Sequence, residues 1–163
     1  MLDQNHTNNP FENKVRVRVC GLLKENEEIL LLKHDQIGPA GYLWSPPGGG
    51  VSFGASVEET LKQEFLEETN LEVAVGDYLF TNEFISEKHH AIELFFTVER
   101  ISGNLQLGKD PELADDEQIL SEIRFFSPEE LNNLPELTIH NAFLAAGARD
   151  KITDLRGLIT FKH

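Results

Sequence analysis

Residues 46–73, PPGGGVSFGASVEETLKQEFLEETNLEV, join a glycine-rich segment to an acidic stretch. Ser56 lies three residues before Glu59, which is the capping-box pattern that marks the start of a helix. Asn70 is a suitable end, because asparagine tolerates the left-handed conformation that closes many helices. The sequence therefore predicts a glycine turn followed by a helix that begins after Ser56 and ends at Asn70.

Three glutamates of this helix, Glu64, Glu67 and Glu68, share one face, because residues three and four apart are neighbours on a helix. Lys62 projects away from that face, so the repulsion between the carboxylates is not offset locally. Magnesium prefers oxygen ligands and is commonly held by one or two carboxylates together with substrate phosphates. A solvated acidic face is the alternative, but the glycines allow backbone to approach a ligand closely. Together the two features favour a site for metal and phosphate.

The whole chain has the length and composition of one globular domain. It has 163 residues, of which 40% are apolar, and it contains no apolar run long enough to cross a membrane. We expect residues 1–13 to be a short polar lead-in and residues 14–163 to form a single domain. The lead-in lacks the basic start and apolar core of a signal peptide, and the lone Cys20 cannot form an internal disulfide. Both features predict a cytoplasmic location, and Cys20 is interpreted as a core residue.

The charge of the chain restricts its partners. The formal net charge is -14, and no basic stripe is evident. Nucleic-acid and anionic membrane surfaces are therefore not expected as partners. A polyanionic partner must instead be small or be bound through a cation.

Strands and helices are mixed along the chain without a regular alternation, which predicts an α+β fold with a mixed β-sheet. Ser127, Pro128 and Glu130 form a second helix start with its own capping box. Residues 100–118 are interpreted as a loop, residues 140–150 as a further helix, and residues 157–161 as a strand or part of a contact. Alternating or apolar runs predict strands at 14–24, 29–34, 42–45, 72–85, 91–99 and 122–126.

The stretch resembles the box of the Nudix (MutT-like) hydrolase family, G-x5-E-x7-R-E-U-x-E-E-x-G-U, where U is a bulky aliphatic residue. Gly49 takes the first glycine, and Glu64, Glu67 and Glu68 take the glutamates of the core. The preceding YLWSPPGGG and the later FFSPEELNNL are also similar to family features. The resemblance implies an α/β/α sandwich with a mixed sheet. It also implies hydrolysis of the pyrophosphate bond in a nucleoside diphosphate linked to another moiety, such as ADP-ribose, a nucleotide sugar or a nucleoside triphosphate.

The resemblance further implies a cofactor, Mg²⁺ with Mn²⁺ as a substitute, and a set of ligands for it. Glu64 and Glu68 are the expected direct ligands, and Glu67 is expected in direct or indirect contact. The carbonyl of Gly48 is expected to complete the site, and Glu64 could instead orient the attacking water. The three glutamates are accordingly the main catalytic candidates.

Three positions depart from the family pattern. Ala55 replaces the first box glutamate, Gln63 replaces the arginine, and Asn70 replaces the second glycine. In the family that arginine braces the loop and helix by pairing with acidic groups. Losing both partners of a pair can be nearly neutral, whereas losing one leaves a buried charge. We interpret Ala55 and Gln63 as the coupled loss of a structural bridge.

The general base is not identified by the box. Glu93, within the predicted strand at 91–99, is the most rigidly placed candidate, and its alternatives are a solvated strand position or a salt-bridge partner. Glu83 and an acidic loop, Asp115 to Glu117, are the other candidates. Lys33 and His34 end a strand where a cation could meet phosphate, or where they are simply solvated.

A second functional interpretation is a catalytically weak or inactive nucleotide-binding sensor that kept the fold. The departures at Ala55 and Gln63 favour it. Retention of three mutually repelling carboxylates favours the hydrolase. The sequence also allows a homodimer, which contacts near the C-terminus could form.

Overall fold

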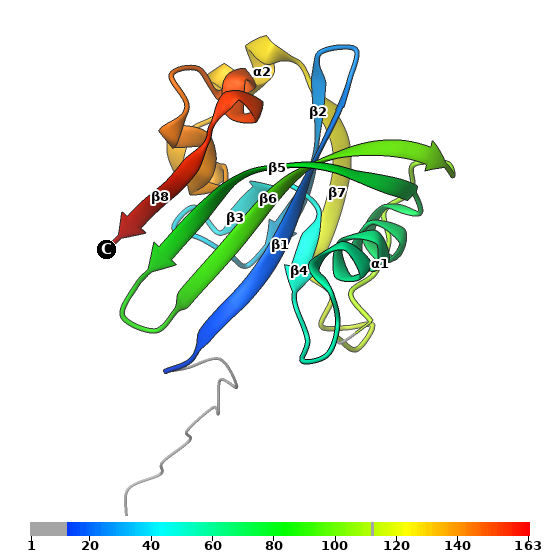
Figure 1. Ribbon diagram of the computed structural model, residues 1–163, viewed down its shortest axis with the longest axis horizontal. Coiled ribbons are helices and arrows are strands. Elements are labelled where there is room, and N and C mark those ends of the chain that lie inside the picture. The colour runs from blue at the N-terminus through cyan, green and yellow to red at the C-terminus, as the bar shows by residue number, and fades with distance from the viewer. Residues whose placement is uncertain (1–12, 112) are drawn as a thin grey trace, which may run out of the picture.

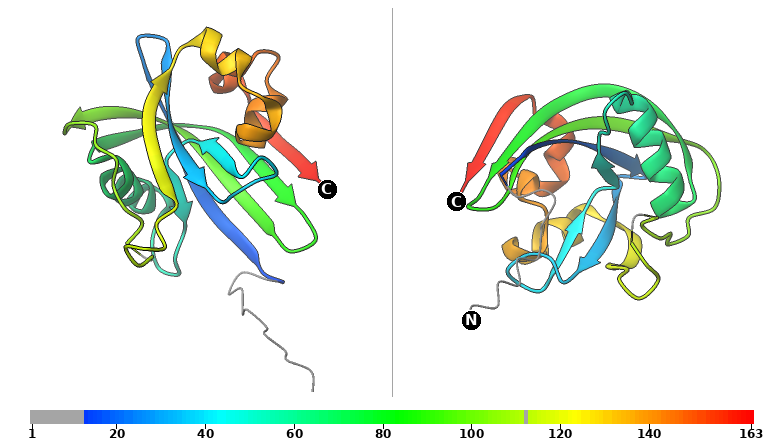
Figure 2. Two further views of the ribbon diagram at one scale, coloured as in Figure 1. Left: turned by 180° about the vertical axis from the view of Figure 1, so that it is seen from behind. Right: turned by 90° about the horizontal axis from the view of Figure 1, so that it is seen from below.

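A computed structural model of the protein describes residues 13–111 and 113–163. Most of the predicted lead-in, residues 1–12, lies outside the described residues. The described chain forms a strongly twisted sheet with helical segments on two sides (Figures 1 and 2). Eight strands contribute to this sheet: β1 (Val15–Glu25), β2 (Glu28–Asp35), β3 (Tyr42–Ser45), β4 (Gly48–Gly50), β5 (Glu72–Ile85), β6 (His90–Ser102), β7 (Leu120–Phe126) and β8 (Gly157–Lys162).

The sheet is mixed, as the sequence predicted. Its strands follow the order β3-β2-β1-β6-β5-β8, with β4 paired to β1 and β7 paired to β2. The pairs β1–β6 and β5–β8 are parallel, while the other pairs are antiparallel. Strand β1 therefore lies at the centre, and it contacts β6 over most of its length and the glycine strand β4 beside it.

Helical segments cover both faces, which gives the predicted α/β/α layering. Helix α1 (Val57–Thr69) packs on one face through a core that includes Val19, Leu61 and Phe65. The other face carries α2 (Pro128–Asn133) and three short 3₁₀ segments, Glu136–Thr138, Asn141–Ala145 and Arg149–Asp154. A second core fills that side, with Phe80, Phe95 and Phe143 fully buried.

The predicted limits of α1 are confirmed. Ser56 accepts a hydrogen bond from the amide of Glu59, and the Glu59 carboxylate accepts one in return from the amide of Ser56. Asn70 has a φ of 59° and closes the helix in the left-handed conformation. Ser127 and Glu130 form the second predicted capping box, at the start of α2.

Two local predictions are corrected. Gly48–Gly50 is not only a turn, because it forms the short strand β4, whose backbone pairs with Arg18, Val19 and Cys20 of β1. A Cβ at Gly48 would collide with the carbonyl of Val19, so a glycine is needed for this close approach. Residues 140–150 do not form one helix, because Ala146 takes an extended conformation between two 3₁₀ segments.

The loop between β6 and β7 closes against the end of α1. The amide of Gln106 donates to the carbonyl of Thr69 over 3.0 Å, and the amide of Gly108 donates to the carbonyl of Glu68 over 2.8 Å. These bonds satisfy carbonyls that a helix end leaves without intrahelical partners. They also bring Asp110, two residues after Gly108, to the side of the helix that carries the glutamates.

Candidate active site

A cleft of about 810 Å³ lies between α1, strands β1 and β4, and the β6–β7 loop. Its volume is within the range of small-molecule sites. Glu64, Glu67 and Glu68 all line it, as do the glycines of β4. The structure therefore brings the predicted glycine and carboxylate residues to one cavity.

Glu68 is the most constrained of the three glutamates. Its side chain is buried, and its Oε2 accepts a hydrogen bond of 3.1 Å from the amide of Gly48. Burial, followed by the charge of Glu64, raises the pKa of Glu68 well above its usual value. The Gly48 amide and the nearby Arg18 act in the opposite direction on this pKa. A buried carboxylate beside a second one is stabilised by a bound cation, which removes this repulsion.

Glu64 lies against the glycine strand. A Cβ on Gly49 would collide with the Glu64 carboxylate, so the absence of a side chain at Gly49 makes room for it. Glu64 and Glu68, one helical turn apart, thus meet β4 at adjacent residues, Gly49 and Gly48. This contact fixes both carboxylates relative to the sheet.

Glu67 has a different environment. Its Oε1 accepts a hydrogen bond of 2.7 Å from the side-chain amide of Gln63, one turn earlier on α1. Gln63 therefore contacts an acidic group of the box although it replaces the charged arginine of the family pattern. Ala55 lies on the wall of the same cleft. Lys62 pairs with Glu58 over 2.6 Å and does not neutralise the three glutamates.

The donor chemistry fits a hard divalent cation. Oxygen atoms of Glu64 and Glu68 share one cleft with the glycine backbone, and one or two carboxylates suffice for magnesium when phosphates and waters complete the shell. Among residues 13–111 and 113–163, no three His, Cys, Asp or Glu side chains converge into a metal-binding group. Glu64 and Glu68 therefore supply the carboxylates in contact with the glycine strand, while one oxygen of Glu67, which also lines the cleft, accepts a hydrogen bond from Gln63.

Basic residues line the cleft as well. Arg16, Arg18 and His34 belong to strands β1 and β2 and contribute to its wall. Burial, followed by the charge of Arg18, lowers the pKa of His34 to about 4, so this ring is neutral near pH 7. Its Nε2 is buried without a hydrogen-bond partner within the described part of the chain. Such unsatisfied groups are rare in proteins, and a ligand in the cleft would explain this one.

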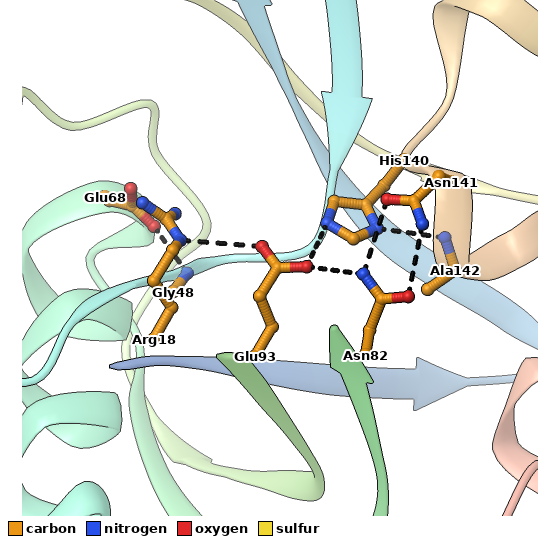
Figure 3. A network of polar contacts seen from close by, with 8 residues as sticks. All are labelled: Arg18, Gly48, Glu68, Asn82, Glu93, His140, Asn141 and Ala142. Carbon is orange, nitrogen blue, oxygen red and sulfur yellow. Dashed lines mark hydrogen bonds and ion pairs between the residues drawn. The ribbon is translucent and has the colours of Figure 1, made fainter. Parts of the chain in front are cut away.

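Glu93 lies in a buried polar network beside the cleft (Figure 3). Its carboxylate accepts a hydrogen bond of 2.8 Å from Asn82 Nδ2 and lies 3.0 Å from His140 Nε2 and 3.6 Å from Arg18 Nε. Burial by itself raises the pKa of Glu93, but His140, Arg18 and Asn82 outweigh it and lower the pKa to about 2. This environment favours the salt-bridge interpretation that the sequence left open, because a general base needs a higher proton affinity.

The remaining candidates for the base lie elsewhere. Glu83 pairs with His90 and accepts a hydrogen bond from Thr160. Asp115 pairs with Lys109 at the surface.

Cys20 is buried, and burial raises the pKa of its thiol, which agrees with its interpretation as a core residue.

Two residues of the cleft, Arg18 and Asp110, were missed by the sequence reasoning. Apart from the glutamates of α1, Asp110 is the acidic side chain that the described residues contribute to the cleft wall. Its position depends on loop contacts that leave no sequence pattern. Arg18 had a usable signal, since the alternation VRVRV places Arg16 and Arg18 on one face of β1.

Comparison with known proteins adds a family assignment to this geometry. The sequence model of the NUDIX domain matches residues 12–146. An ADP-ribose pyrophosphatase from Methanocaldococcus jannaschii is 32% identical over 123 residues, which are 74% of this chain and 65% of that protein. This chain thus spans slightly less than two thirds of the curated relative it matches.

Solved structures show the same fold. A MutT protein from Methanosarcina mazei Go1 superimposes with a TM-score of 0.65 at 22% identity, covering 86% of this chain and 93% of that one. A NUDIX hydrolase from Nitrosomonas europaea superimposes with a TM-score of 0.62 at 16% identity, covering 90% and 79%. Among residues 13–111 and 113–163, every helix is too short or too polar to span a bilayer.

Proposed function

Because this chain belongs to the NUDIX domain family, we propose that it is a divalent-metal-dependent pyrophosphohydrolase that acts on a nucleoside diphosphate linked to another moiety. The observation that carries the proposal is the pair Glu64 and Glu68, packed against β4 inside a cleft that also presents basic groups. ADP-ribose is the substrate to test first, because the similar protein from Methanocaldococcus jannaschii is an ADP-ribose pyrophosphatase.

Glu64 and Glu68 would hold Mg²⁺ or Mn²⁺, with the carbonyl of Gly48 and the carboxylate of Glu67 as further ligands. When bound, a divalent cation supplies the charge that draws phosphate oxygens towards the carboxylates and lowers the pKa of water. The protein contributes the geometry. The Gly48 amide holds the Glu68 carboxylate in place, and the absence of a Cβ at Gly49 leaves room for Glu64.

Asp110 is the group we propose to accept the proton of the attacking water. It lines the cleft and interacts electrostatically with Glu68, and the backbone contacts of its loop with α1 support it. Glu93, the candidate suggested by the sequence, would act differently, because its carboxylate is engaged by Asn82 and His140.

The sensor interpretation has one structural observation in its favour. Gln63, which stands in place of the arginine of the family pattern, donates a hydrogen bond to one oxygen of Glu67 and thereby engages an atom that a metal would otherwise use. A sensor would bind the nucleotide without cleaving it.

Product analysis on a panel of nucleotides separates the two functions. The panel contains ADP-ribose, a nucleotide sugar and a nucleoside triphosphate, each with and without Mg²⁺ or Mn²⁺. Wild type is compared with Glu68→Gln and with Glu58→Gln, a control on the same helix that pairs with Lys62 outside the cleft. Cleavage that requires the metal and Glu68 but not Glu58 supports the hydrolase. Absence of cleavage together with a raised melting temperature for one nucleotide supports the sensor.

A further inference from the structure

Arg18 occupies a position between the glycine strand and the buried carboxylate of Glu93. On β1 it is in register with Gly50 of β4 on one side and with Glu93 of β6 on the other. Its side chain is 30% exposed, and it contributes to the wall of the cleft. A cation at this point lies beside the carboxylates that would receive the metal.

The Glu93 carboxylate has more partners than an ion pair with Arg18 requires. His140 and Asn82 both contact its Oε2, while Arg18 approaches its Oε1. These partners are themselves held in place. Asn82 and Asn141 exchange hydrogen bonds of 3.4 and 3.1 Å, and the amide of Ala142 donates to His140 Nδ1 over 3.2 Å. The 3₁₀ segment Asn141–Ala145, with His140 at its start, thereby fixes Glu93 relative to the sheet (Figure 3).

The guanidinium of Arg18 presents two different sides. Its Nε side faces Glu93, while its terminal nitrogens point towards the side of Glu68 (Figure 3). A guanidinium has five N–H donors in a planar fork, which matches the oxygens of a phosphate. Fixing the Nε side by a buried carboxylate reduces the conformational freedom that an arginine loses when it binds an anion.

We propose that Arg18 is the residue that binds the diphosphate of the substrate through its terminal nitrogens, and that Glu93 is a positioning residue that orients Arg18. The inference rests on the proposed function, since it assigns a phosphate contact within the same cleft. This assignment explains why the buried carboxylate of Glu93 lies behind Arg18, a basic residue of the cleft in an otherwise acidic protein. It also predicts that Glu93 influences substrate binding without contacting the substrate.

Two measurements test Arg18. The first is KM and kcat for ADP-ribose with Mg²⁺, and the second is the Kd of α,β-methylene-ADP, a nucleoside diphosphate with a non-cleavable bridge, by calorimetry. Arg18→Ala should raise both KM and Kd by about 10- to 100-fold, the effect of losing hydrogen bonds to a charged group. Arg18→Lys, which keeps the charge but not the fork, should recover only part of this loss.

Arg100→Ala is the matched control. Arg100 is also 30% exposed and also pairs with a carboxylate, that of Glu25, but it lies outside the cleft. It should leave KM and Kd unchanged. If Arg18→Ala binds the analogue as tightly as Arg100→Ala does, the inference is overturned.

A double-mutant cycle tests Glu93. Glu93→Gln should raise KM and Kd by less than Arg18→Ala, and should add nothing further in the Arg18→Ala background, because both changes act through one group. Effects that add in full would overturn the positioning role. Near-ultraviolet circular dichroism tests whether each variant is folded. If Arg18→Ala is not folded, Arg18→Lys takes its place in the cycle.

The outcomes distinguish this inference from the proposed function. If wild type binds α,β-methylene-ADP but cleaves no nucleotide, the hydrolase proposal fails while the Kd series still decides the role of Arg18. If wild type cleaves ADP-ribose and Arg18→Ala retains its KM and Kd, only the assignment of Arg18 fails. If wild type binds neither compound and cleaves no nucleotide of the panel, both are overturned.

Discussion

The carboxylate of Glu68 accepts a hydrogen bond of 3.1 Å from the amide of Gly48, and this bond joins helix α1 to strand β4. Gly48 in turn pairs with Cys20 of the central strand. The most buried glutamate of the cleft is thus anchored through two elements to the middle of the sheet. Its position is preorganised before any ligand binds, which is the arrangement expected of a binding site built on rigid elements.

Glu68→Gln should separate stability from metal binding. Because burial and Glu64 raise the pKa of Glu68, its ionisation opposes folding above pH 4.5 in the metal-free protein. The neutral glutamine removes this cost, so the melting temperature without metal should be equal to or above that of wild type. Added Mg²⁺ should raise the melting temperature of wild type more than that of Glu68→Gln. Differential scanning calorimetry with and without EDTA measures this, and equal Mg²⁺ responses would remove Glu68 from the ligand set.

Gly48→Ala and Gly49→Ala should have different effects. A Cβ at Gly48 would strike the backbone carbonyl of Val19, so Gly48→Ala should lower the free energy of unfolding by about 2 kcal/mol or more. A Cβ at Gly49 would strike only the Glu64 carboxylate, which can move, so Gly49→Ala should cost activity more than stability. Urea unfolding and steady-state kinetics separate the two.

Gly147→Ala is the control for both glycine substitutions. A Cβ there would contact nothing within 4 Å, so stability and activity should both stay close to wild type. If Gly49→Ala retained full activity, the packing of Glu64 against β4 would have no functional role.

Asp110→Asn should lower kcat by about 100-fold or more while KM changes little, because a general base acts on the reaction step rather than on binding. Asp115→Asn is the comparison, since Asp115 belongs to the same loop but pairs with Lys109 at the surface. A kcat for Asp110→Asn equal to that of Asp115→Asn would assign the base elsewhere.

His34 should make stability depend on pH. Its pKa is lowered to about 4 in the folded chain from 6.5, so the unfolded chain binds more protons between these values. This contribution to stability is present above pH 6.5 and is lost as the pH falls towards 4. Its full size is about 3 kcal/mol at most. Urea unfolding of wild type and His34→Gln at several pH values measures it, and parallel curves for the two proteins would contradict the prediction.

Helix α1 shows how far local sequence signals reach. Its start at Ser56, its end at Asn70 and the shared face of its three glutamates were all predicted correctly, because capping and helical periodicity involve residues within one or two turns. The alternation in β1 and the capping box of α2 were readable for the same reason. The irregular mixture of strands and helices predicted the mixed sheet, and the family resemblance added its α/β/α layers.

The tertiary structure decided the environment of each charged group. Glu93 could be a base, a solvated residue or a salt-bridge partner until the parallel pairing of β1 and β6 set it opposite Arg18 and the C-terminal segment brought His140 to it. The positions of Asp110 and β4 were likewise set by backbone contacts. Hydrogen bonds and burial between residues distant in sequence control these environments and their pKa values. The sequence by itself thus determined which carboxylates lie together on α1, and the fold determined what surrounds them.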